Sequence, residues 1–328
     1  MRIPHDRDVK VSFLAWTFAW HPAVDTGMSS KKTQGNKTPQ QTGASQVEGV
    51  WRLRSARRTA HGSTSDWFGA HPDGLLTFTD DLHFTEAVTR TDLPLVASGS
   101  RLSATPEENR ALAQGTLGSY GTYTKGDDGS LTGQHVLGST FPGWNNTRRG
   151  ANDVHVTDGQ LSQDLRLGDD DTVKLTWEYA GTAASPKGDN QVAAAWRLDS
   201  ARADTPGRTV QPFGPEPGGY LIFADSGYFT DVLHRPGLPA LVSGDLLQGT
   251  DEENERTVQD TLVVFGTYTV DDGGDFKDEQ VLRSSFPNWN GMRRDTSSLT
   301  ETVHGDTMTE HLDDGDGVVI TLTFSRQR

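Results

Sequence analysis

Residues 139–149 read STFPGWNNTRR, and nearly the same letters return as SSFPNWNGMRR at residues 284–294. The offset between these stretches is 145 residues, and the same offset aligns further short motifs. They are WRL at Trp51 and Trp196, FG at Phe68 and Phe213, EEN at Glu107 and Glu252, and GTYT at Gly121 and Gly266. A repeat of this length is a whole domain, because solenoid repeats have periods of about 20 to 50 residues. The chain therefore contains two copies of one module.

The duplication divides the 328-residue chain into two domains, at residues 47–181 and 192–328. Each copy is long enough to bury its own hydrophobic core. Residues 182–191 are small and polar and are broken by Pro and Gly, so we interpret them as a linker. We interpret residues 1–46 as a disordered polar leader or an over-extended start. We expect a cytoplasmic protein, and secretion through residues 1–27 is the alternative.

The composition argues against several classes of function. The formal net charge is −15, and an acidic chain without a basic stripe repels the phosphate backbone of nucleic acids. The absence of cysteine excludes disulfides, thiolate metal sites and thiol nucleophiles. No apolar run reaches the roughly 18 residues that a membrane span needs. We therefore expect neither a nucleic-acid partner nor a membrane span.

Motifs for bound metals and cofactors are also missing. The sequence has no HExxH, no GxSxG, no P-loop and no GxGxxG on a strand-to-helix turn. The acidic stretch at residues 312–317 lacks the terminal Glu of a calcium loop and is predicted to be a hairpin turn. We therefore expect no metal and no cofactor.

Short β-rich runs separated by turn residues dominate both copies. In the second copy they are YLIFA (220–224), YFTDVLH (228–234), VVFGTYTV (263–270), DEQVLRSSF (278–286) and VVITLTF (318–324). One helix is predicted in each copy, at residues 105–115 and 250–260, because Thr105 and Thr250 each begin the Thr-x-x-Glu pattern of a capping box. Each module is thus predicted to have about eight antiparallel strands and one inserted helix. Closing such a sheet into a barrel leaves room for one small ligand.

A longer series of motifs in the second copy points to a known family. It consists of GYLIFADSGYFTDVLHRPGLPALVSGD (219–245), GTDEEN (249–254), GTYTV (266–270) and SSFPNWNGMRR (284–294). This series resembles the bacterial lipocalin-like domain, and the first copy matches it more loosely. In the first copy Leu75 replaces Tyr220, Thr89 replaces His234 and Ser100 replaces Asp245. The resemblance implies an all-β fold of two tandem antiparallel lipocalin-like barrels of calycin type.

Two functions are compatible with this resemblance, which settles no reaction by itself. More distant similarity to allene-oxide-cyclase-like barrels and to two-barrel natural-product cyclases implies a cofactor-independent cyclase or isomerase. Its substrate would be a hydrophobic, polyketide-like intermediate in a barrel cavity or in the cleft between the barrels. The alternative is a non-catalytic carrier of a small lipophilic ligand, and a pure interaction role is a third option. Polar groups inside a preformed cavity would favour the enzyme. The oligomeric state stays open.

The turn after YFTDVLH contains a candidate acid–base pair. His234 and Asp245 can meet across this turn, and histidine titrates near neutral pH. In the alternative interpretation, Asp245 caps the turn or pairs with Arg235. Asp231 lies three residues before His234 and is expected on the opposite face of the strand.

The repeated FP-x-W-N-x-x-RR motif has two interpretations. In the functional one, Trp289 floors a ligand pocket while Arg293 or Arg294 binds an enolate or carboxylate. In the structural one, which we favour, the Trp closes the barrel end and one Arg stacks on it or pairs with a buried acid.

Four candidate catalytic residues result from these motifs, namely His234, Asp245, Arg293 and Tyr220, the last as a donor to a ligand carbonyl. The candidate ligand-binding residues are Trp289, Arg235, Tyr228, Tyr268, Trp196, Trp144 and Arg148. Trp196 and its counterpart Trp51 are more typical of a barrel floor, since each opens the first strand of its copy.

Overall fold

The computed structural model describes residues 46–168, 171–183, 190–313 and 317–328. The predicted leader, apart from Gln46, lies outside this described part, and so does most of the predicted linker. The acidic stretch 312–317 is described only at its two ends.

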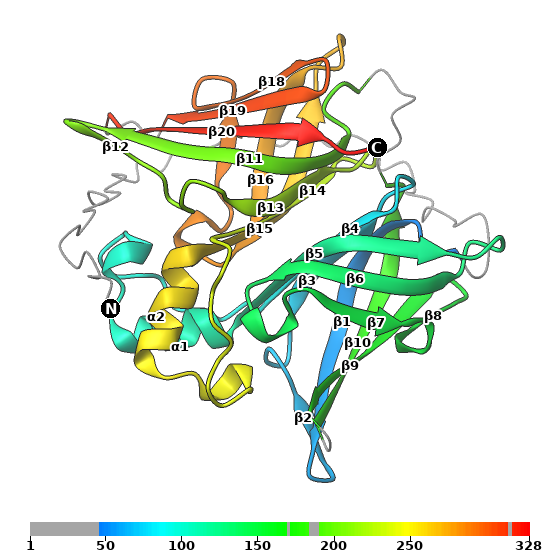
Figure 1. Ribbon diagram of the computed structural model, residues 1–328. Coiled ribbons are helices and arrows are strands. Elements are labelled where there is room, and N and C mark those ends of the chain that lie inside the picture. Colours follow the sequence, from blue (N-terminus) through cyan, green and yellow to red (C-terminus); the bar gives the residue numbers. More distant parts are fainter. Residues whose placement is uncertain (1–45, 169–170, 184–189, 314–316) are drawn as a thin grey trace, which may run out of the picture.

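Each copy forms a ten-stranded antiparallel sheet that curls into a nearly closed barrel (Figure 1). Barrel 1 contains β1 (Gly49–Ala60), β2 (Ser63–Asp66), β3 (Asp73–Phe78), β4 (His83–Thr89), β5 (Thr116–Lys125), β6 (Leu131–Ser139), β7 (Thr147–Gly150), β8 (Val154–Thr157), β9 (Gln160–Gly168) and β10 (Asp171–Gly181). Barrel 2 contains β11 (Ala194–Thr205), β12 (Arg208–Val210), β13 (Gly218–Phe223), β14 (Tyr228–His234), β15 (Thr261–Val270), β16 (Phe276–Ser284), β17 (Arg293–Asp295), β18 (Leu299–His304), β19 (Thr307–Asp313) and β20 (Val319–Arg326). The all-β prediction is confirmed. The predicted count of about eight strands was too low, because strands as short as β12 and β17 are too short to show an alternating pattern.

The two barrels have the same strand order. It is β7-β6-β5-β4-β3-β1-β10-β9-β8 in barrel 1 and β17-β16-β15-β14-β13-β11-β20-β19-β18 in barrel 2. The last hairpins also match in register, so that the pair Val154–Gln163 in barrel 1 is equivalent to the pair Glu301–Glu310 in barrel 2. Positions in the two interiors can therefore be compared one by one.

One capped helix interrupts each barrel, as predicted. These are α1 (Pro106–Gln114) and α2 (Asp251–Asp260). The side chain of Thr105 accepts a hydrogen bond from the Glu108 backbone, and the Glu108 carboxylate in turn accepts one from the Thr105 N–H. The same capping box starts α2 at Thr250. The two helices pack against each other at one side of the molecule, next to both barrels (Figure 1).

The tryptophan at the start of each barrel is part of the core. Trp51 on β1 and Trp196 on β11 are fully buried, and each indole N–H donates to a backbone carbonyl four residues earlier. The guanidinium of Arg326 lies 4.3 Å from the centre of the Trp196 ring. These contacts confirm the barrel-floor interpretation of both residues.

The barrels pack sheet to sheet. Strands β4 and β5 of barrel 1 face β13 to β15 of barrel 2, and β6 also contacts β14 (Figure 1). The interface buries Leu75 and Tyr120 from barrel 1 against Tyr220, Val232 and Val263 from barrel 2. Successive side chains of a strand point to opposite faces of the sheet. The strands of barrel 2 that contact barrel 1 with one face therefore line the interior of barrel 2 with the other.

Each barrel also receives a loop from the other one. Leu241 and Leu246 precede α2, and both are buried in the core of barrel 1. Arg101 occupies the position of Leu246 in the loop before α1, and it lines the interior of barrel 2. Its guanidinium donates to the backbone carbonyls of Val258 and Thr261 at the end of α2, at 3.4 and 2.6 Å.

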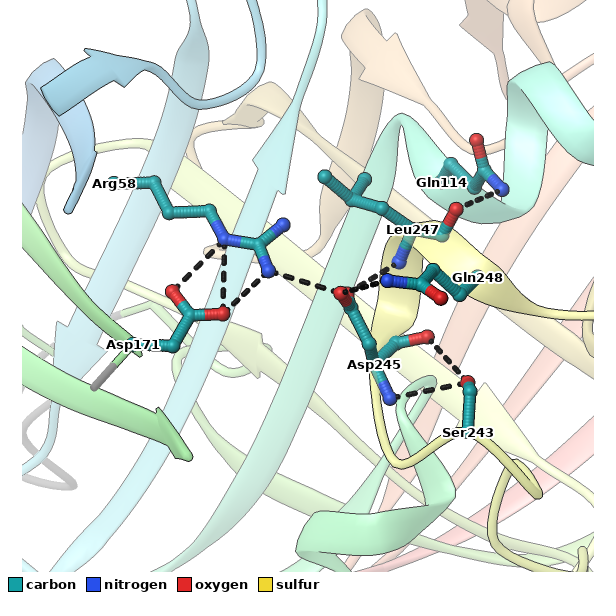
Figure 2. A network of polar contacts seen from close by, with 7 residues as sticks. All are labelled: Arg58, Gln114, Asp171, Ser243, Asp245, Leu247 and Gln248. Atoms are coloured by element: carbon teal, nitrogen blue, oxygen red, sulfur yellow. Dashed lines mark hydrogen bonds and ion pairs between the residues drawn. The ribbon is translucent and has the colours of Figure 1, made fainter. Parts of the chain in front are cut away.

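A charged clamp holds the loop from barrel 2 at the mouth of barrel 1 (Figure 2). Arg58 on β1 pairs with Asp171 and also with Asp245, the latter at 3.0 Å. The Asp245 carboxylate in addition accepts from the Leu247 N–H at 2.9 Å. Asp245 thus caps its turn, as one interpretation predicted, but its cationic partner is Arg58 and not Arg235.

Candidate functional site

Barrel 2 encloses a cavity with a volume of about 110 Å³. Most of its wall is apolar, since the strands of this barrel place alternate hydrophobic side chains inward. Representative lining residues are Phe213, Leu221, Phe229, Leu262, Phe286 and Trp289. Arg101 from barrel 1 completes the lining.

Four carboxyl groups interrupt this apolar wall. They belong to Asp231 on β14, Glu279 on β16, Glu301 on β18 and Glu310 on β19. Each lies on the inward face of its strand; Asp231, for example, stands between Phe229 and Leu233, which also line the cavity. Asp231 and Glu301 are 7% exposed and Glu279 is 5% exposed. Acidic side chains are rarely buried to this extent without a cation for each of them.

The carboxyls have only one close cationic partner among the described side chains. The Arg294 guanidinium donates to Glu279 Oε1 at 2.8 Å and lies 4.7 Å from the centre of the Trp289 ring. Glu301 and Glu310 are directly opposite each other on β18 and β19, so that their carboxyls interact. Within the described residues, Asp231 Oδ1, Glu301 Oε2 and Arg294 Nη2 are buried and have no hydrogen-bond partner.

The buried location favours the neutral form of these acids. Burial raises the pKa of Asp231 well above its usual range, and the nearby carboxyls of Glu310 and Glu279 raise it further. Burial also raises the pKa of Glu279, although Arg294 opposes this. Burial and the Glu310 carboxyl raise the pKa of Glu301 well above its usual range, and burial raises the pKa of Glu310 to about 7. Near neutral pH the cavity therefore contains protonated carboxyls beside one that is close to its titration midpoint.

The equivalent positions of barrel 1 are nearly all uncharged. Glu86 replaces Asp231, whereas Gln134, Val154 and Gln163 replace the three glutamates. Arg149 pairs with Glu86 at 3.2 Å. With its amide oriented to satisfy its neighbours, Gln163 donates to Glu86 at 3.0 Å and accepts from Arg149 at 3.1 Å. The interior of barrel 1 thus holds a network in which the single acid is paired with a cation and the other positions are neutral.

Comparison with known families identifies the fold unit. A family model for a lipocalin-like domain matches residues 48–180 and again residues 193–326. The chain belongs to the lipocalin-like domain family. It contains this domain in two tandem copies, and lipocalin-like barrels typically bind small hydrophobic ligands.

Solved structures with some similarity to the chain are remote. A candidate outer membrane protein of Bacteroides fragilis is 11% identical over 86% of this chain and 98% of that one, with a TM-score of 0.23. A protein of unknown function from Nostoc punctiforme is 10% identical over 86% and 96%, with a TM-score of 0.19. Transferrin binding protein B of Neisseria meningitidis is 8% identical over 81% and 53%, with a TM-score of 0.14. At these scores the similarities carry no inference, and no curated protein matches the chain.

The described residues show neither a metal-binding group nor a membrane-spanning helix. They contain no group of three or more His, Asp or Glu side chains arranged to hold a metal ion. No helix in the same part of the chain is long and apolar enough to cross a membrane.

The predicted His234–Asp245 pair is not formed in this lipocalin-like protein. His234 points away from the cavity of barrel 2, and its Nε2 lies 2.9 Å from the hydroxyl of Tyr120 in barrel 1. Its pKa is lowered by burial. Asp231 faces the cavity, which confirms that it and His234 lie on opposite faces of β14. The candidate Tyr220 also lies in the interface between the barrels, 4.9 Å from the Tyr120 ring.

In both copies of the repeated motif an arginine stacks on the tryptophan and pairs with a buried acid, as the structural interpretation describes. It is the second arginine of each pair. Arg149 lies over Trp144 at 4.6 Å in barrel 1, as Arg294 lies over Trp289 in barrel 2. The candidates Arg148 and Arg293 are exposed. Neighbouring residues of a strand face opposite sides, and the sequence did not show which of the two faces inward.

The remaining candidates have partners of their own. Arg235 binds Asp260 at 2.7 Å. Tyr268 is buried and donates to the Ala224 carbonyl at 2.9 Å. Tyr228 packs in the interface between the barrels, and Trp196 and Trp144 belong to the barrel cores. Of the predicted ligand-binding residues, Trp289 lines the cavity.

The acidic cluster was not among the predicted residues, although the sequence contains a signal for it. In β18, Glu301 stands between Leu299 and Val303 at a spacing of two, and Glu310 stands in the same way between Met308 and Leu312. An acid in the middle of an inward-facing apolar series marks a buried carboxylate. Arg101 had no such signal, because its cavity belongs to the other barrel.

Proposed function

We propose that barrel 2 is the active copy and that it catalyses an acid–base isomerisation or cyclisation of a small, hydrophobic natural-product intermediate. The observation that supports this proposal is the cavity itself, which combines an apolar wall with carboxyls in different protonation states. Polar groups in a preformed cavity were the feature expected of an enzyme rather than a carrier. Titratable groups with strongly shifted pKa values in a cavity are typical of functional sites.

The chemistry follows from the environments of the carboxyls. Glu310, with its pKa near 7, acts as the general base and removes a proton from one atom of the substrate. Glu301 or Asp231, which stays protonated, delivers a proton to another atom. The electron pair released at the first atom shifts along the substrate to the second, so the product has the same composition as the substrate. The apolar wall holds the reactive conformer.

The test is to incubate the full chain with a lipophilic extract of its producing cells, then to analyse bound and released molecules by native mass spectrometry and chromatography. Wild type is expected to release a molecule of unchanged mass and changed connectivity. Glu310→Gln removes the base without changing the size of the side chain, and conversion is expected to fall about 100-fold or more. Glu252→Gln, an exposed position on α2, is the matched control and is expected to convert normally.

One outcome would favour the alternative function. If wild type and both variants retain a molecule that is released unchanged, the protein is a carrier and the assignment of acid and base roles is wrong.

A further inference from the structure

We infer that the cavity of barrel 2 selects a hydrophobic amine in its protonated form, with the ammonium group among Asp231, Glu301 and Glu310. The inference rests on the proposed function in one respect, namely that this cavity is the ligand site. It goes further by assigning the polar group of the ligand.

The first argument is the balance of charge in the cavity. Four carboxyls line it, and the cationic side chains that line it are Arg294 and Arg101. Arg294 is bound to Glu279, and Arg101 is bound to two carbonyls of α2. When all the carboxyls ionise, two negative charges have no cation. A bound organic cation would supply a positive charge for them.

The second argument is the pair of oxygen atoms without partners. Asp231 Oδ1 and Glu301 Oε2 belong to side chains that are more than nine-tenths buried, and neither has a hydrogen-bond partner among the described residues. Buried polar atoms of native proteins are nearly always paired, and an exception indicates a missing ligand, ion or water. An ammonium group has up to three N–H donors for such acceptors.

The third argument separates an amine from a neutral ligand. A neutral ligand that needs only hydrogen bonds is served equally well by amides, which both donate and accept. Barrel 1 has such amides, Gln134 and Gln163, at the positions of Glu279 and Glu310. Unlike an amide, a carboxyl can lose its proton, and the resulting carboxylate inside an apolar wall attracts a cation.

The test uses three probes with the same phenyl body and different polar ends. These are 2-phenylethylamine, 2-phenylethanol and 3-phenylpropanoate, titrated calorimetrically into the full chain at pH 8. The amine is expected to bind about tenfold more tightly than the alcohol, which corresponds to one hydrogen bond to a charged group. Its affinity is expected to fall about tenfold at pH 5.5, where Glu310 also holds its proton. Titration of the amine in two buffers of different ionisation enthalpy is expected to show proton release by wild type.

Variants that copy the residues of barrel 1 sharpen this test. Glu301→Val and Glu310→Gln give barrel 2 the residues that barrel 1 has at the equivalent positions, Val154 and Gln163. Each variant is expected to bind the amine about tenfold more weakly, while its affinity for the alcohol changes about twofold or less. Glu252→Gln is again the control. The measurement of proton release needs no variant, so it remains decisive if a variant fails to fold.

The outcomes separate this inference from the proposed function. If the alcohol binds as tightly as the amine, or if the phenylpropanoate binds best, the cavity is a ligand site but its selectivity for amines is refuted. If none of the three probes binds, both the inference and the assignment of the cavity as the ligand site are refuted.

Discussion

Barrel 1 and barrel 2 have the same strand order, the same capped helix and the same Trp–Arg stack, yet their interiors differ. Barrel 1 contains a paired Gln and Glu–Arg network, and Leu246 of its neighbour fills its mouth. Barrel 2 has four carboxyls around a cavity, with Arg101 at the equivalent position of its mouth. The shared features therefore specify the fold, and the unshared ones are the basis for proposing barrel 2 as the functional copy.

The direction of the difference is informative. Burying carboxyls in an apolar wall destabilises the folded state unless cations pair with them. The paired network of barrel 1 shows that this fold accommodates amides at two of the same positions. The acids of barrel 2 are therefore expected to lower its stability, and strongly shifted carboxyls of this kind are common at functional sites.

The largest effect is expected when the plug of barrel 1 is removed. Leu246→Ala should lower the free energy of unfolding by about 3 kcal/mol, because it leaves a cavity in a packed core. Its neighbour Leu247 is 38% exposed, so Leu247→Ala is the control and should change stability by about 0.5 kcal/mol or less. Urea unfolding of both variants measures this difference. Equal effects would show that Leu246 is no plug.

The next effect concerns the charge of barrel 2. The unfolded chain ionises Glu310 near pH 4.5, whereas the folded protein holds that proton up to about pH 7. The folded state binds more protons in this window, so its stability should fall as the pH rises through it. Glu310→Gln should remove this loss and be more stable than wild type by about 3 kcal/mol at pH 8, with no such gain at pH 4. Urea unfolding at several pH values checks this, and an unchanged pH dependence would contradict it.

A smaller effect of opposite sign is expected at His234, which barrel 1 replaces by Thr89. Burial lowers the pKa of His234, so below pH 6.5 the unfolded chain takes up a proton that the folded state rejects. Stability should therefore fall as the pH drops below 6.5. Relative to wild type, His234→Thr should gain about 1 kcal/mol between pH 7 and pH 5, as urea unfolding at both pH values would measure. A variant whose stability tracks that of wild type over this range would show that His234 is protonated in the folded protein.

The smallest effect tests what the barrels share. Thr105→Ala and Thr250→Ala each remove one capping box and should each lower the free energy of unfolding by about 1 kcal/mol. Because the two caps have the same geometry, the two losses should agree. Thermal unfolding of both variants is the measurement, and a clear difference between them would mean that the helices are not equivalent.

Much of the fold could be predicted from local patterns. The capping boxes at Thr105 and Thr250, the floor residues Trp51 and Trp196 and the duplication itself depend on short motifs at fixed spacing. The strands β2 and β12 were missed because their length of three or four residues gives no periodic signal.

The candidate site was harder to predict because it depends on which face of a strand points inward. His234 and Arg293 carry suitable chemistry, but they face the other barrel and the solvent, while their neighbours Asp231 and Arg294 face the cavity. Arg101 enters barrel 2 from the other barrel, and no pattern within one copy contains that information.

The most direct test of the difference between the barrels is hydrogen-exchange mass spectrometry of the full chain, with and without the molecule that it binds from the lipophilic extract. Slower exchange is predicted in β14, β16, β18 and β19, which carry the four carboxyls, with no change in β4, β6, β8 and β9. Protection of the barrel 1 strands, alone or to the same degree, would contradict the assignment of barrel 2 as the functional copy.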